Sequence, residues 1–178
     1  MKKLSLNKFI ILACAAWVFM FSCSKKEDNE EENNSTNDTS LEYLDQNLQG
    51  EIENTAWEMV VGNTKRNWWN GNYEFKMVNI LGDTCFLNFV DTAYGGVIFS
   101  LTPENFKVGQ TLTFNNFENI TLVEYTKNDG PHNFGVFNGK LELTKIDTVN
   151  DNIVEGKVVG KYDKDNFVNG NFTIKYCQ

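Results

Sequence analysis

The chain has little of several residue types on which common functions depend: its 178 residues include one histidine, His132, and two prolines. A lone histidine argues against a histidine-based metal centre and against acid–base catalysis by histidine. The sequence also lacks the GxSxG and P-loop motifs, and no serine or cysteine stands in a supported pattern with the histidine. We therefore predict a protein that is not an enzyme and that has no cofactor, no catalytic residues and no metal ligands.

Basic residues are also scarce, with 16 Lys and Arg against 24 Asp and Glu and a formal net charge of −8. Proteins that bind DNA or RNA present a basic face, so nucleic acid is excluded as a partner. Hydrophobic residues make up 41% of the chain, enough for a core, yet no long segment shows the 3.6-residue period of an amphipathic helix.

Only one long apolar run is present, at residues 9–21 (FIILACAAWVFMF), after three lysines. Its 13 residues are too few for a transmembrane helix, which needs roughly 20. A basic start followed by a short apolar run predicts a signal peptide over residues 1–22. The run ends at Ser22-Cys23, which resembles the relaxed lipobox of Bacteroidota lipoproteins, with palmitate and other acyl chains carried on Cys23. The alternative is a plain secretory signal peptide.

Residues 23–47 contain the predicted lipidated cysteine and an acidic tether rich in Glu, Asp, Asn, Ser and Thr. Such a composition buries too little apolar surface to fold, so we expect this linker to be disordered. Without residues 1–22 the chain has 13 basic and 24 acidic residues, a net charge of −11. The acidic cluster behind Cys23 resembles the surface-export signal of Bacteroidota lipoproteins. We expect an outer-membrane lipoprotein held through its lipid and exposed at the cell surface, with the periplasmic face as the alternative.

Residues 48–178 have the sequence pattern of antiparallel strands, in which short runs of alternating apolar residues are separated by Asn, Asp and Gly. Asn138-Gly139 is a typical hairpin turn. The spacing predicts a single all-β domain, an antiparallel β-sandwich of about 8–10 strands, with a lipocalin-like β-barrel as the alternative. The predicted core comprises Trp57, Met59, Phe75, Met77, Leu87, Phe89, Val97, Phe99, Leu112, Phe114, Leu122, Leu141, Leu143, Val158, Phe172, Ile174 and Tyr176.

Cys85 and Cys177 are the only cysteines left after Cys14 leaves with the signal peptide and Cys23 is lipidated. A disulfide between them is favoured outside the cytoplasm. Strand alternation argues weakly against it, because Cys177 falls on the opposite face from Phe172. The sequence is compatible both with this disulfide and with two unpaired cysteines.

Trp68, Trp69 and Tyr73 lie around a turn rich in asparagine. Adjacent tryptophans on a strand point to opposite faces, so at least one is expected to be exposed. The three aromatic side chains are a candidate platform for stacking a sugar ring. The plainer interpretation places one tryptophan over the end of the core and the other on the loop.

Two further short patterns are weaker. The acidic stretches 147–152 and 163–166 offer oxygen ligands but miss the spacing of a calcium loop, so we interpret both as hairpin turns. Thr92 and Thr148 each follow an aspartate and precede a small or aliphatic residue, which resembles the acceptor motif of Bacteroidota O-glycosylation. Both threonines are candidate glycosylation sites.

Several segments together resemble a pattern in small uncharacterised Bacteroidota lipoproteins. The resemblance rests on residues 139–147 (GKLELTKID), Gly156-Lys157-Val158, Asn169-Gly170-Asn171-Phe172 and the opening Thr55-Ala56-Trp57. It covers roughly residues 48–178, and Val158 departs from it by replacing an aromatic residue. The resemblance implies an all-β lipoprotein domain and supplies no site residues.

These features lead to the hypothesis of a lipid-anchored envelope protein that acts as a non-catalytic binding or structural module, with a glycan or protein partner at the cell surface. The alternatives are a carbohydrate-binding accessory protein of a glycan-uptake system and a lipocalin-like carrier of an apolar ligand.

Overall fold

The computed structural model describes residues 41–85, 92–114, 120–136 and 138–178. The chain divides into units 1–38 and 39–178, and every described residue belongs to the second. The predicted signal peptide, the predicted lipidation site Cys23 and most of the tether therefore lie outside the described residues. The predicted core residues Leu87 and Phe89 do so as well.

The described residues form an all-β domain, as predicted, with eleven strands. Their bounds are β1 (Gln49–Ile52), β2 (Thr55–Glu58), β3 (Val61–Arg66), β4 (Tyr73–Val78), β5 (Tyr94–Leu101), β6 (Thr111–Phe114), β7 (Ile120–Thr126), β8 (Gly130–Gly135), β9 (Asn138–Asp147), β10 (Ile153–Lys161) and β11 (Phe167–Cys177).

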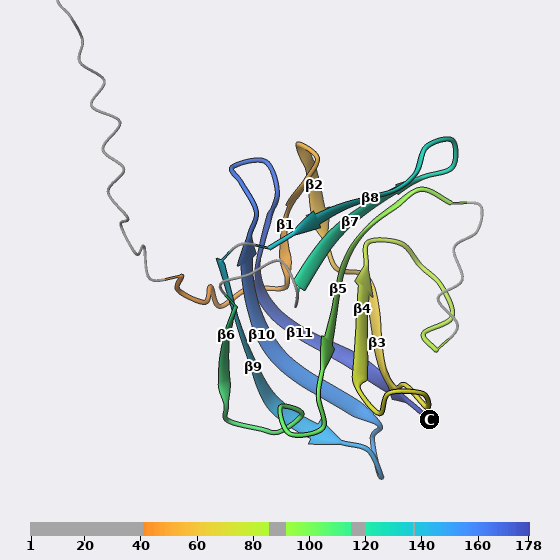
Figure 1. The fold of residues 1–178 in the computed structure, drawn as a ribbon, viewed down its shortest axis with the longest axis vertical. Coiled ribbons are helices and arrows are strands. Elements are labelled where there is room, and N and C mark those ends of the chain that lie inside the picture. The colour runs from red at the N-terminus through yellow and green to blue at the C-terminus, as the bar shows by residue number, and fades with distance from the viewer. Residues whose placement is uncertain (1–40, 86–91, 115–119, 137) are drawn as a thin grey trace, which may run out of the picture. The chain divides into compact units, whose positions relative to one another are not determined.

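All eleven strands belong to one sheet in the order β6-β9-β10-β11-β3-β4-β5-β7-β8, with β1 paired to β11 and β2. The pairs are antiparallel except β11–β3, which is parallel. Figure 1 shows this sheet curled into a half-barrel, with the long strands β9, β10 and β11 strongly curved. The pairing therefore differs from the predicted sandwich, which would need two facing sheets, and from a wholly antiparallel arrangement.

Two local features mark the curved β9–β10–β11 region. A β-bulge between Glu155 and Gly156 shifts the register of β10 against β9, and such bulges bend strands. Gly156 is also the residue over which the Phe172 ring packs, since a Cβ there would lie 2.6 Å from the ring. The strand can pass this close to the aromatic side chain only because residue 156 has no side chain.

The predicted core is confirmed at most positions. Of the predicted residues, Trp57, Phe75, Met77, Val97, Phe99, Phe114, Leu122, Leu141, Leu143, Val158, Phe172 and Ile174 are buried, while Met59, Leu112 and Tyr176 pack against them half-buried. At the centre, the Phe75 and Phe99 rings stack at 4.3 Å, and Phe172 meets both edge-on. The concave side of the sheet is thus filled by side chains.

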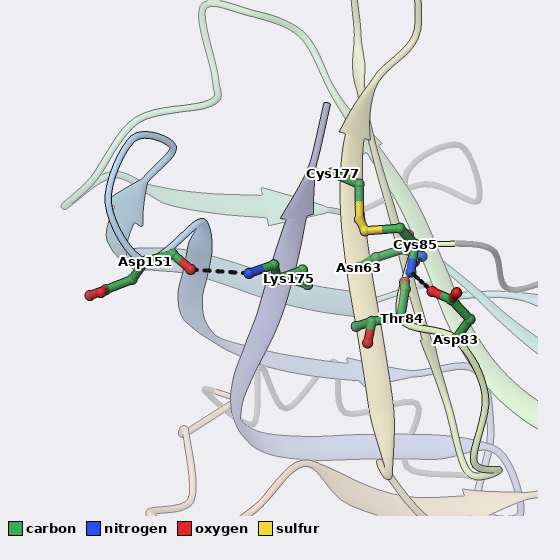
Figure 2. Close-up of a disulfide and its surroundings, with 7 residues drawn as sticks. All are labelled: Asn63, Asp83, Thr84, Cys85, Asp151, Lys175 and Cys177. Carbon is green, nitrogen blue, oxygen red and sulfur yellow. Dashed lines mark hydrogen bonds between the residues drawn. A yellow bond between two sulfur atoms is a disulfide. The ribbon is translucent and has the colours of Figure 1, made fainter.

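A disulfide joins Cys85 to Cys177, with 5.7 Å between the two Cα atoms. It ties the last residue of β11 to the segment that follows β4, as Figure 2 shows. The alternation argument against this bond fails because alternation itself ends at residues 175–177, where β11 pairs with β3 and Cys177 is buried.

The folded unit begins before residue 48. Residues assigned to the tether pair with β11: the amide of Leu44 donates to Asn169 Oδ1 (3.0 Å), Asn169 Nδ2 donates to the Glu42 carbonyl (2.9 Å), and the amide of Asn171 donates to the Gln46 carbonyl (2.7 Å). This strap, residues 41–47, was missed because its apolar residues are too few to form a strand pattern. Hydrogen bonds from the backbone and from asparagine side chains attach the strap to the sheet.

Loss of the disulfide should destabilise the domain strongly. The bond closes a segment of 92 residues, and cross-linking residues so far apart removes much entropy from the unfolded chain. We expect the Cys85→Ala/Cys177→Ala variant to lower the free energy of unfolding by about 4 kcal/mol in urea denaturation. Reductant should destabilise the native protein and leave the double variant unchanged. Equal stability of the oxidised and reduced native protein would contradict this expectation.

The pKa of Tyr43 makes the stability of the domain depend on pH in the alkaline range. Burial, and then the neighbouring Glu142 carboxylate, raise the pKa of Tyr43 to about 12 from a usual value of 10.0. The folded state therefore holds the phenol proton more tightly than the unfolded chain does, and this contribution to stability is lost as the pH rises from about 10 to 12. We expect Tyr43→Phe, which also removes a buried hydroxyl without a hydrogen-bond partner, to show a smaller loss of stability across that window. An equal loss of stability in the two proteins between pH 10 and 12 would refute the raised pKa of Tyr43.

Candidate functional site

The turn between β3 and β4 carries two highly exposed tryptophans. Trp68 is 88% exposed and Trp69 is 81% exposed. Their rings meet edge-on, with centroids 5.3 Å apart and planes at 88°. Among the described residues these are two of the few large apolar side chains left in solvent. Most other large apolar side chains, such as that of Trp57, are buried in the core.

Asparagine side chains fix the shape of this turn. Asn67 Oδ1 accepts hydrogen bonds from the backbone amides of Trp69 (2.8 Å) and Asn70 (3.4 Å), and Asn67 Nδ2 donates to the Glu74 carboxylate (2.5 Å). The turn closes through the Asn67 amide, which donates to the Asn72 carbonyl (2.7 Å). Hydrogen bonds therefore fix the backbone of the turn that carries the two tryptophans.

Tyr73 does not join the platform that the sequence suggested. Its ring stacks on Phe106, with centroids 3.7 Å apart and planes at 11°, and packs against the core. The strand alternation that begins at Tyr73 turns this residue inward, whereas the tryptophans precede the strand. The candidate platform is reduced to Trp68 and Trp69.

A second group of polar side chains gathers where the β1–β2 hairpin lies against β7 and β8. The hairpin turns through Glu53 and Asn54, both with positive φ (50° and 58°). Two such residues make a type I′ turn, which usually prefers Asn or Gly. The amide of Glu53 donates to Asn166 Oδ1 (2.9 Å), and the amide of Asn54 donates to the Asp165 carbonyl (3.3 Å), so the β10–β11 turn holds the hairpin.

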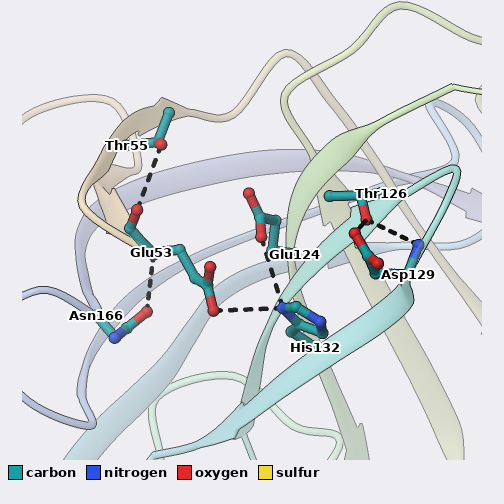
Figure 3. Close-up of polar contacts among 7 residues, drawn as sticks. All are labelled: Glu53, Thr55, Glu124, Thr126, Asp129, His132 and Asn166. Atoms are coloured by element: carbon teal, nitrogen blue, oxygen red, sulfur yellow. Dashed lines mark hydrogen bonds and ion pairs between the residues drawn. The ribbon is translucent and has the colours of Figure 1, made fainter.

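Glu53, Glu124 and His132 point toward one another from three segments, as Figure 3 shows. Glu124 and His132 are cross-strand partners in the β7–β8 hairpin. His132 Nδ1 lies 3.4 Å from a Glu53 carboxylate oxygen and 3.8 Å from a Glu124 carboxylate oxygen. Burial, and then the Glu53 carboxylate, raise the pKa of Glu124, while the nearby His132 opposes that shift.

A pocket of about 180 Å³ adjoins this group and shares Glu124 with it. Its wall includes Trp57, whose indole is 3% exposed and whose Nε1 has no hydrogen-bond partner. The indole can lie there because residue 95 is glycine: a Cβ at Gly95 would fall 2.5 Å from the Trp57 ring. Asn79 fixes the other side, since its Oδ1 accepts from the Gly95 amide (2.8 Å).

The remaining candidate residues belong to neither group. Thr92 is exposed just before β5, and Thr148 lies half-buried in the β9–β10 turn. In that turn, Asp147 Oδ1 accepts from the amides of Asn150 (2.8 Å) and Val149 (3.0 Å), which lower the pKa of the carboxyl group. Residues 163–166 form the β10–β11 turn, as expected.

The sequence reasoning missed the group of Glu53, Glu124 and His132. The contact between Glu124 and His132 could have been predicted, because the hairpin register across residues 126–130 pairs the two residues. The position of Glu53 could not have been predicted, since Glu53 comes from a hairpin some seventy residues earlier. That hairpin is brought to β7 by its pairing with β11.

Comparisons with known proteins add no family. No family model matches this chain, and searches of curated proteins and of solved structures find no match either. Within the described ranges, no helix has the length and apolar character needed to cross a bilayer.

Proposed function

We propose that the chain is a lipid-anchored protein of the cell envelope that acts as a non-catalytic binding module for neutral glycans. The observation that carries this proposal is the pair of tryptophans, 88% and 81% exposed, on a turn fixed by Asn67. Exposed aromatic faces suit the apolar faces of sugar rings, and a turn whose backbone is already fixed loses little entropy on binding. The neighbouring asparagine side chains can hydrogen-bond sugar hydroxyls.

The charge of the protein points to neutral glycans rather than acidic ones. The chain carries a formal net charge of −8, which repels polyanions. The lipocalin-like carrier finds less support, because Phe75, Phe99 and Phe172 fill the concave side of the sheet where an apolar ligand would lie.

The envelope location is supported by two separate features. The Cys85–Cys177 disulfide is typical of proteins outside the cytoplasm. The short apolar run that ends at Ser22-Cys23 supports export and lipid attachment at the outer membrane, in keeping with the Bacteroidota lipoproteins that the sequence resembles.

Substitution of either exposed tryptophan should weaken glycan binding without unfolding the protein. In calorimetric titrations with a panel of neutral polysaccharides, we expect Trp68→Ala and Trp69→Ala each to weaken binding by about 2 kcal/mol, roughly 30-fold, as is usual for a tryptophan that dominates an interface. Stability should change by less than about 0.5 kcal/mol, because both side chains are in solvent.

The matched control is Trp57→Phe, which changes a buried tryptophan outside the turn. This variant should lose stability and retain glycan affinity. The proposal fails if no neutral glycan binds the native protein, or if both exposed tryptophans can be replaced without loss of affinity.

Lipid attachment is tested separately by metabolic labelling with palmitate. We expect labelled acyl chains on the native protein and none on Cys23→Ala, which should appear in the soluble fraction. Label retained by Cys23→Ala would overturn the anchor and leave the glycan proposal standing.

A further inference from the structure

The three side chains of Glu53, Glu124 and His132 come from different parts of the fold yet converge on one point. Their ligand atoms all lie within 4.8 Å of one another. The positions are not those of an acidic loop: one residue lies in the β1–β2 turn, one on β7 and one on β8. The hydrogen bond from the Glu53 amide to the buried Asn166 side chain holds the first of them in place (2.9 Å).

The separations between the three side chains leave room for an ion between them. Charge-assisted hydrogen bonds between an imidazole and a carboxylate close to roughly 2.8 Å. Here the two separations from His132 Nδ1 are 3.4 Å and 3.8 Å. Zinc holds nitrogen and oxygen ligands at about 2.0–2.2 Å, so two ligands of a tetrahedral site lie roughly 3.4 Å apart.

A second observation points independently to a ligand at this place. The pocket that shares Glu124 is also lined by Trp57, whose indole N–H is buried and has no hydrogen-bond partner. Buried polar groups are nearly always paired, so an unpaired one beside an open pocket indicates a missing partner. A metal with three protein ligands keeps a fourth position for water or for another oxygen ligand, and such a ligand can enter from this pocket.

We propose that Glu53, Glu124 and His132 form a binding site for a divalent transition metal of the zinc type, open to the pocket lined by Trp57. Both carboxylates and Nδ1 of the imidazole are the ligand atoms. Imidazole with carboxylates suits zinc, copper or nickel, whereas calcium and magnesium prefer oxygen ligands alone. The site is therefore selective for the first group.

The presence of one histidine in the chain makes the test specific. Full-length protein purified without a histidine tag is titrated with Zn²⁺, and the ring resonances of its only imidazole are followed by NMR, beside calorimetry. We expect saturable binding with one zinc per chain, a shift of the His132 resonances on the same isotherm, and no comparable shift with Mg²⁺ or Ca²⁺.

Three variants identify the ligands. Glu124→Gln, His132→Asn and Glu53→Asn should each lower zinc affinity at least about 10-fold. Asparagine is chosen at position 53 because it tolerates the positive φ of that turn, so that the hairpin keeps its shape. The matched control is Glu58→Gln, which removes the same charge from the exposed end of the same hairpin and should leave affinity unchanged.

Thermal unfolding without metal separates loss of a ligand from loss of the fold, since the variants should unfold at or near the native temperature. The proposal is overturned if zinc leaves the His132 resonances unmoved, or if the control loses as much affinity as the ligand variants. Equal binding of zinc and magnesium would also contradict it.

Discussion

Strand β11 is the element on which the rest of the described structure depends. On one edge it pairs with β10 along nearly its whole length. On the other edge it pairs antiparallel with β1 near its start and parallel with β3 at its end, where the Cys85–Cys177 disulfide secures its last residue. Without this change of partner the N-terminal hairpin and the β3–β4–β5 strands would have no common neighbour.

The two candidate sites lie at opposite ends of the β4–β5 pair. Tyr73 pairs with Leu101 beside the tryptophan turn, whereas Val78 pairs with Gly96, next to the pocket residue Gly95. The turn depends on local asparagine hydrogen bonds. The group at the other end depends on long-range pairing, because Glu53 reaches it only through the attachment of β1 to β11. Binding at one end therefore needs no contribution from the other.

The sequence predicted what is local and missed what is long-range. Alternation identified the all-β class and core residues such as Phe75 and Phe172. The predicted hairpin turn at Asn138-Gly139 was wrong, because both residues belong to β9 and pair with the end of β10. The single sheet was missed because the parallel β11–β3 pair joins residues more than a hundred positions apart, and no local pattern encodes such pairing. Exposed tryptophans could be predicted from their place in a polar turn. The environment of His132 could not, because one of its two carboxylate neighbours comes from a distant hairpin.

Hydrogen exchange of individual backbone amides, measured with the disulfide intact and reduced, tests the central position of β11 most directly. Amides deep in the fold exchange only on global unfolding, whereas edge strands open locally. The slowest exchange should lie in β10 and β11, and reduction should speed exchange at the β3–β11 pairing (Lys175–Cys177) while the amides paired with β1 stay protected. Exchange in β11 as fast as in the edge strands β6 and β8 would contradict this account.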